Sequence, residues 1–309
     1  MTIKKSKQPR SVSDFLEAIY QIDPEDEVLC FRGEANGAWQ TKPSVMRALK
    51  DDAERHIISE LTLEASSEFL SDTSMFKKLV RAQHFGLPTR LLDVSLNPLV
   101  ALYFACSDHS QMGSAGQLII YRFKRNRVKF ADSDAVSIVS NLANLRDDER
   151  IELNTEAKAY LNKYTTEERK NPDLRTDFNK LKSADRLAQF VRVEKPYFRA
   201  NINPVDLRKY YFVYPHKDNR RIIAQSGAFI IAGLLSYQRA SSSKGFAVEK
   251  IEIPANAKET IISQLDKINI NKRTLFPEIE STSRYIKERW TASNEVIEDV
   301  DDSDDEGGE

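Results

Sequence analysis

Residues 81–108 hold the densest group of side chains that are able to do chemistry. The stretch reads RAQHFGLPTRLLDVSLNPLVALYFACSD and carries His84, Thr89, Arg90, Asp93 and Ser95. These polar residues alternate with Leu, Val, Phe and Pro, so part of the stretch must lie inside the fold. Because buried polar groups need hydrogen-bond partners, the pattern indicates a structured site more than a plain core element.

A second candidate is the tripeptide Arg32-Gly33-Glu34, which follows the apolar run 28–31. A short apolar run of this kind favours a buried strand. A glycine beside the arginine lets a ligand or another backbone approach closely. Two interpretations stay open: Arg32 binds a ligand, or it pairs with a carboxylate at the edge of the core, for which Asp93 is the first candidate.

The elements around residues 81–108 follow from helix and turn signals. A helix over 72–85, capped by Asp72 or Thr73, ends at Gly86, where a left-handed residue is expected. A strand over 91–95 follows, and Asn97-Pro98 provides a cap and a first-turn proline for the next helix. His84 then lies in the last helical turn, either as a neutral core or capping residue or as a cation favoured by the helix dipole.

The rest of the chain predicts an α+β fold. Strands are expected at 28–31, 117–123, 209–214, 221–225, 228–231 and 246–253, and helices at 13–20, 43–50, 53–70, 256–266 and 281–290. About three amphipathic helices form an insertion near 125–195. We therefore expect a mixed, largely antiparallel sheet of roughly six to eight strands with surrounding helices. Residues 1–290 would form one domain, and residues 291–309 an acidic, disordered tail.

The composition narrows the class of protein. With 40% hydrophobic and 30% charged residues, the chain is typical of soluble globular proteins. The two cysteines, Cys30 and Cys106, lie in apolar runs, which favours reduced core thiols and a cytoplasmic location. No apolar run approaches the length that a membrane span needs, so no membrane partner is expected.

The charge is distributed unevenly along the chain. Residues 295–309 hold nine acidic and no basic residues, which leaves 46 basic against 38 acidic residues in the remainder. A basic body tolerates a polyanion or a dinucleotide. The acidic end is either a solubilising tail or a cover for a basic groove.

Several familiar sites have no counterpart in the sequence. The four histidines and two cysteines lack metal-ligand spacing, so no metal is expected. There is no glycine-rich phosphate loop and no GxSxG elbow. The basic patches also lack the regular aromatic residues of nucleic-acid modules.

Two motifs carry a family resemblance. Phe31-Arg32-Gly33 precedes a longer pattern, His84-x-Gly86-Leu-Pro88-Thr89-Arg90-Leu-Leu-Asp93-x-Ser95-x-x-Pro98-x-x-Ala101-Leu-Tyr-Phe104-Ala105. Together they resemble the FRG domain family, which is named for the first tripeptide. Arg220-Arg221-Ile-x-x-Gln225-Ser-Gly227-Ala-Phe229 and Thr274-Leu-Phe276-Pro277 extend the resemblance to about residue 288. Val94 stands where the family often has Trp, a change that we expect to affect packing. The resemblance implies a bacterial or phage-related setting and a site, but no defined reaction.

The same residues are also similar to the arginine-serine-glutamate arrangement of NAD-dependent ADP-ribosyltransferases. This similarity implies that Arg32 holds a phosphate or ribose of NAD, that Ser95 fixes the dinucleotide, and that Gln225 takes the place on a late strand. The chain departs from the arrangement at Gly227, where such enzymes carry the catalytic glutamate. A neutral amide cannot supply the negative charge that an oxocarbenium-like state needs, and Glu249 and Glu252 on the next strand are the candidate substitutes.

Our leading hypothesis is an intracellular FRG-domain protein with a pocket for a nucleotide-like small molecule. If it is an enzyme, which the residues leave open, it uses NAD for ADP-ribosyl transfer or NAD cleavage in a toxin or phage-defence setting. The alternative is a sensor or interaction module that binds a phage component, nucleic acid or a partner protein. In a third interpretation, the polar residues form a buried network that fixes the fold. The expected catalytic residues are Arg32, Ser95 and Gln225, and the expected ligand-binding residues are Gly33, Glu34, His84, Thr89, Arg90, Asp93 and Arg221.

Overall fold

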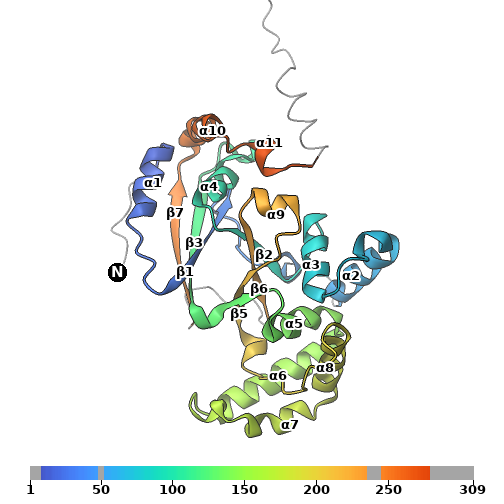
Figure 1. Cartoon of the computed structure of the whole chain (residues 1–309). Helices are drawn as coiled ribbons and strands as arrows, with labels where there is room; N and C mark the ends of the chain where they lie inside the picture. The colour runs from blue at the N-terminus through green and yellow to red at the C-terminus, as the bar shows by residue number, and fades with distance from the viewer. Residues whose placement is uncertain (1–7, 48–51, 235–244, 279–309) are drawn as a thin grey trace, which may run out of the picture.

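A seven-stranded sheet forms the centre of the protein (Figure 1). The structure is a computed structural model that describes residues 8–47, 52–234 and 245–278. In spatial order the strands run β4-β5-β6-β2-β1-β3-β7, and every pair is antiparallel except β4 with β5. The strands are β1 (Glu27–Glu34), β2 (Leu91–Ser95), β3 (Gly116–Lys124), β4 (Val128–Phe130), β5 (Tyr210–Tyr214), β6 (Gly227–Ala232) and β7 (Phe246–Ile253). The predicted mixed, largely antiparallel sheet is confirmed.

The sheet curls back on itself around an aromatic core. Phe123 of β3 lies 5.9 Å from Phe212 of β5, measured between ring centroids, although three strands separate β3 from β5 in the sheet order. Phe246 of β7 meets Tyr210 of β5 edge to face at 5.7 Å. These contacts close the inner face of the curl with buried rings, so the inside of the sheet is packed core.

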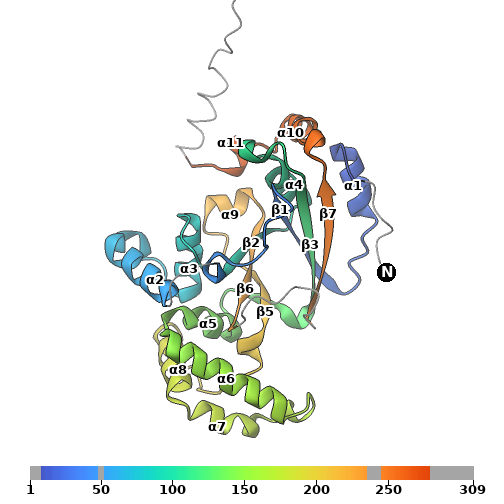
Figure 2. The same ribbon diagram turned by 180° about the vertical axis from the view of Figure 1, so that it is seen from behind.

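Helices cover the outer face of the sheet in two groups. The first group packs on β1, β3 and β7 through residues such as Phe15, Leu102 and Ile261. It consists of α1 (Val12–Tyr20), α4 (Pro98–Cys106), α10 (Lys258–Lys267) and α11 (Lys272–Leu275). The second group packs on the β5, β6 and β2 end, and Figure 2 shows it from behind. It consists of α2 (Ala53–Glu64), α3 (Met75–His84), α5 (Asp134–Asn141), α6 (Asp147–Lys163), α7 (Thr176–Asn179), α8 (Lys182–Glu194) and α9 (Arg220–Ala224).

Helix α4 crosses β1 closely because the contact is built from small residues. A Cβ atom placed on Gly33 would lie 1.8 Å from the Ala101 carbonyl oxygen and 2.6 Å from the Ala105 amide nitrogen. The glycine therefore admits another backbone, which is one of the two roles that the sequence left open. Along the described parts of the chain, none of the helices has the length and apolar character needed to cross a membrane.

Several predicted elements differ in the structure. The predicted strand at 221–225 is wrong, because Asn219 starts helix α9 there by accepting hydrogen bonds from the Arg221 and Ile222 amides at 2.8 and 3.3 Å. The predicted helix at 43–50 is reduced to a turn at Ser44–Met46 before residues that the structure does not describe. The helix at 53–70 breaks at Ala65, and α3 is capped by Ser74 instead of Asp72 or Thr73.

The helical insertion lies between β4 and β5, close to the predicted range 125–195. Strand β4, which precedes the insertion, was missed because it has only three residues and its position depends on its parallel partner β5. The predicted helix at 281–290 and the acidic tail at 291–309 lie outside the described residues.

Candidate functional site

A cavity of about 180 Å³ lies where β1, β2, α4 and α9 meet. It brings together the three residues expected to be catalytic, which come from distant parts of the sequence. Its lining consists of Phe31, Arg32, Gly33, Asp93, Val94, Ser95, Ala101, Phe104, Arg221 and Gln225. Six of the ten predicted site residues therefore share this cavity.

The cavity exists because β1 and β2 separate after a single residue pair. Phe31 and Ser95 are the partners in this ladder, whereas β1 pairs with β3 over its whole length. Beyond that pair, Arg32 Nη1 donates to the Asp93 carbonyl oxygen at 2.9 Å. The guanidinium thus satisfies a strand carbonyl at the point where the two strands move apart.

Glu34 holds Arg32 from behind. Its carboxylate is buried and accepts from Arg32 Nε at 3.0 Å, from Thr41 Oγ1 at 2.8 Å and from Gln117 Nε2 at 2.7 Å. Glu34 does not line the cavity, and the geometry gives it a positioning role. Arg32 Nη2 makes no hydrogen bond within the described residues, so it is available to a ligand. Sequence reasoning missed Thr41 and Gln117; the one signal was a glutamine that begins an otherwise apolar strand.

The carboxylate of Asp93 faces the solvent side of the cavity. It accepts from Gln83 Nε2 at 2.7 Å, and it makes no ion pair with Arg32 or Arg90. The suspected Asp93–Arg32 pairing is thus replaced by a contact to the backbone carbonyl of Asp93. Of the described residues that line the cavity, Asp93 is the one carboxylate.

Ser95 and Gln225 join three elements at the cavity wall. Ser95 Oγ donates to the Gln225 carbonyl oxygen at 2.7 Å and accepts from the Asn97 amide at 2.9 Å. Gln225 Nε2 donates to the Leu275 carbonyl oxygen at 2.9 Å. Gln225 is the C-terminal cap of α9 and does not lie on a strand, so the predicted late-strand position is wrong. Both side chains have structural partners as well as a place at the cavity.

Arg221 provides the second guanidinium of the cavity. Its Cζ atom lies 4.8 Å from the Phe276 ring centroid, and Phe276 packs edge to face on Phe104 at 6.0 Å. No carboxylate of the described residues lies within ion-pair distance of Arg221. Sequence reasoning missed this aromatic support, although Phe104 and Phe276 both stand in the motifs that carry the resemblance. Of the two guanidinium groups of the cavity, Arg32 is paired with Glu34, whereas Arg221 has no carboxylate partner among the described residues, so Arg221 is the group that favours an anionic ligand.

His84 lies beside this cavity and lines a neighbouring chamber. Its Nε2 atom is 3.5 Å from Glu278 Oε1. Burial lowers the pKa of His84, the Arg221 charge lowers it further, and Glu278 opposes the shift. The lowered pKa favours the neutral imidazole, the simpler of its two predicted states.

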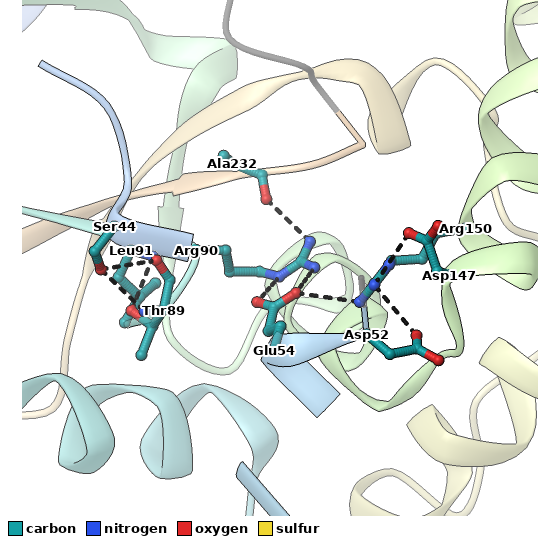
Figure 3. Close-up of polar contacts among 9 residues, drawn as sticks. All are labelled: Ser44, Asp52, Glu54, Thr89, Arg90, Leu91, Asp147, Arg150 and Ala232. Carbon is teal, nitrogen blue, oxygen red and sulfur yellow. Dashed lines mark hydrogen bonds and ion pairs between the residues drawn. The ribbon is translucent and has the colours of Figure 1, made fainter. Parts of the chain in front are cut away.

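Thr89 and Arg90 lie outside the cavity in a buried polar network (Figure 3). Arg90 Nε donates to Glu54 Oε1 at 2.8 Å, its Nη2 contacts Glu54 Oε2, and its Nη1 donates to the Ala232 carbonyl oxygen at 3.3 Å. Thr89 Oγ1 accepts from the Leu91 amide at 3.1 Å, and the Thr89 amide donates to Ser44 Oγ at 3.1 Å. For these two residues the geometry matches the interpretation in which buried polar groups fix the fold. Glu54 carried no signal in the sequence.

The candidate glutamates on β7 lie elsewhere. Glu249 is paired with Arg122 at 3.4 Å, and Glu252 accepts from Gln8 Nε2 at 2.6 Å. Neither lines the cavity, and β3 separates β7 from β1. The described residues contain no group of three or more His, Cys, Asp or Glu side chains arranged to hold a metal ion.

In the comparison with known proteins, a family model matches the N-terminal residues of this site. The family model of the FRG domain matches residues 27–113, from the start of β1 to just past α4. The motifs around Gln225 and Phe276 lie beyond the matched residues. No curated protein and no solved structure matches the chain, so the similarity to ADP-ribosyltransferases stays a prediction. Residues 27–113, which supply Arg32, Asp93 and Ser95 to the cavity, therefore carry an FRG domain.

Proposed function

We propose that the cavity binds the phosphate-bearing part of a nucleotide-like ligand and that NAD is the first ligand to test. The observation that carries the proposal is the meeting of Arg32 and Arg221 in one cavity, where Glu34 balances the charge of Arg32 from behind and Asp93 is the one carboxylate among the described lining residues. A guanidinium makes paired, charge-assisted hydrogen bonds to phosphate oxygens. Arg221 has no carboxylate partner among the described residues, which leaves its charge for a ligand.

Cleavage of NAD is the catalytic form of this proposal, and Asp93 is the residue that favours it. When the glycosidic bond breaks, nicotinamide leaves with the bonding electron pair and positive charge develops on the ribose. Water or an acceptor group then attacks the ribose carbon and releases a proton. A carboxylate near that carbon stabilises the developing charge. Asp93 lines the cavity and is the group available for this role.

Binding without cleavage is the second candidate. It is favoured by the hydrogen bonds of Ser95 and Gln225, which already hold β2, α9 and α11 together. In that form the chain is a sensor whose ligand changes its interaction with a protein or nucleic-acid partner. For both forms, the FRG resemblance implies a toxin or phage-defence setting, and the two cysteines in apolar runs favour a cytoplasmic location.

Calorimetric titration with ADP-ribose tests the binding proposal, because this molecule carries two phosphates and no bond to nicotinamide. Arg221→Met removes the guanidinium that has no carboxylate partner among the described residues. We expect it to weaken binding about tenfold or more, because a charged hydrogen bond of about 1.5–3 kcal/mol is lost. The matched control is Arg125→Met, since Arg125 is 77% exposed and pairs only with the equally exposed Asp26 among the described residues. Equal binding by the Arg221→Met and wild-type proteins would refute the proposal.

Nicotinamide release from NAD separates the two forms of the proposal. Asp93→Asn keeps an oxygen that accepts from Gln83 and removes only the charge. If the wild-type protein releases nicotinamide and Asp93→Asn binds ADP-ribose but does not, the catalytic form holds. Binding of ADP-ribose with no nicotinamide release by the wild-type protein would establish the sensor form instead.

A further inference from the structure

The cavity and two neighbouring chambers share lining residues and follow one another toward α3 and α9, and we call the three together the groove. A chamber of about 80 Å³ shares Asp93, Val94, Arg221 and Gln225 with the cavity. That chamber in turn shares Val80, His84, Asn219 and Ile222 with a larger chamber of about 450 Å³. Figures 1 and 2 both show α3 and α9 side by side, the arrangement that the shared lining requires. The three volumes together match the size of pockets that enclose a nucleotide-sized ligand.

The outer chamber, by which we mean the 450 Å³ chamber between α3 and α9, differs from the cavity in charge. Its cations are paired: Lys77 lies 3.2 Å from Asp218, and Arg81 lies 2.6 Å from Asp72 and 3.8 Å from Glu68. The cavity, by contrast, contains Arg221, which makes no ion pair with any of the residues that the structure describes. One end of the groove therefore attracts an anion, whereas the other presents no uncompensated positive charge.

The outer chamber also presents an aromatic surface. Phe85 is 54% exposed and packs edge to face against His84, with ring centroids 5.3 Å apart. The chamber is lined further by Phe76, Val80 and Ile222. His84 adds a neutral imidazole, which donates through one nitrogen and accepts through the other. An aromatic ring open to solvent beside a neutral hydrogen-bonding group suits a planar, uncharged heterocycle.

We propose that the groove binds its nucleotide end to end, with the phosphate at Arg221 and the base in the outer chamber against Phe85. This inference rests on the proposed function and adds to it the recognition of a nucleobase. It predicts that molecules with a phosphate but no base, such as inorganic pyrophosphate or a sugar phosphate, bind more weakly than the nucleotide.

Titration of a matched ligand set tests the inference. The probes are the 5′-monophosphates of adenosine, guanosine, cytidine and uridine, together with ribose 5-phosphate, which lacks only the base. We expect the best nucleotide to bind at least about tenfold more tightly than ribose 5-phosphate, as one base–aromatic stack gives. Phe85→Ala should remove most of this difference and leave binding of ribose 5-phosphate unchanged. Tyr20→Ala is the matched control, because Tyr20 is 80% exposed and lies on α1, which packs on the β1, β3 and β7 side of the sheet away from the outer chamber.

The two proposals fail in different ways. If the nucleotides bind no better than ribose 5-phosphate, or if Phe85→Ala leaves the difference intact, the base does not lie in the outer chamber and the inference is overturned. In both cases phosphate binding that depends on Arg221 still supports the proposed function. If no probe binds, or if Arg221→Met binds every probe as the wild-type protein does, both proposals fall.

Discussion

The buried pair between Arg90 and Glu54 predicts a large loss of stability when its charge balance is broken. Both side chains are about 5% exposed or less, and the carboxylate also lies 3.6 Å from Arg150 Nη1. Glu54→Gln keeps the shape of the side chain but leaves Arg90 buried without a counter-charge. Removal of one partner from a buried pair costs about 3–5 kcal/mol. This is a large share of the roughly 5–15 kcal/mol that stabilises a typical domain.

Denaturant and thermal unfolding of the wild-type and variant proteins measure this loss. At about 2 °C per kcal/mol for a chain of this size, the melting temperature of Glu54→Gln should fall by roughly 6–10 °C. The double variant Glu54→Leu/Arg90→Met replaces both charges by apolar groups of similar size, and it should recover most of that loss. The double variant should also bind ADP-ribose as the wild-type protein does, since Arg90 lies outside the cavity.

Two results would refute this reasoning. If Glu54→Gln lowers the free energy of unfolding by less than about 1 kcal/mol, the pair does not hold the fold. A loss of that size is typical of solvent-exposed ion pairs. If the double variant folds but no longer binds ADP-ribose, Arg90 belongs to the ligand site, as the sequence analysis predicted.

Two further predictions concern contacts that hold helices in the fold. Gly33→Ala should destabilise the protein by about 1–3 kcal/mol or more, because the new Cβ atom would lie 1.8 Å from the Ala101 carbonyl oxygen. An unchanged midpoint of urea unfolding would show instead that α4 and β1 have room to separate. Glu194 accepts from the Met75 amide at 2.6 Å, and burial raises the pKa of its carboxyl above the ordinary value. The free energy of unfolding should therefore fall as pH rises from the unfolded-state pKa through the raised folded-state pKa. Glu194→Gln keeps the acceptor, so its stability relative to wild type should increase from pH 4 to pH 7; a constant difference across that range would contradict the shift.

Local signals predicted the elements on each side of Arg90. Asn97 Oδ1 accepts from the Leu99 amide at 2.9 Å, and Pro98 begins α4, as their order in the sequence indicates. Gly86 has φ +82°, the left-handed conformation expected after α3. These features depend on neighbours along the chain, and so a single sequence is enough to predict them.

One failure came from a local cap that the sequence analysis overlooked, and the others arose where distant residues decide the outcome. The segment after Asn219 has the paired isoleucines of a strand, but its cap makes it a helix, which placed Gln225 at a helix end. The partner of Arg90 is Glu54, 36 residues earlier, and no spacing rule connects them. The convergence of Arg32, Ser95 and Gln225 was predicted through the family resemblance. Their actual partners, among them Glu34 and Leu275, depend on a sheet order that periodicity does not give.

A crystal structure of the protein with ADP-ribose tests the central claim most directly. Our account predicts that the diphosphate lies in the cavity within hydrogen-bond distance of the Arg221 guanidinium and of Arg32 Nη2. It also predicts that the adenine lies against Phe85. ADP-ribose bound at another surface, with Arg221 and Arg32 making no contact to phosphate, would contradict the account.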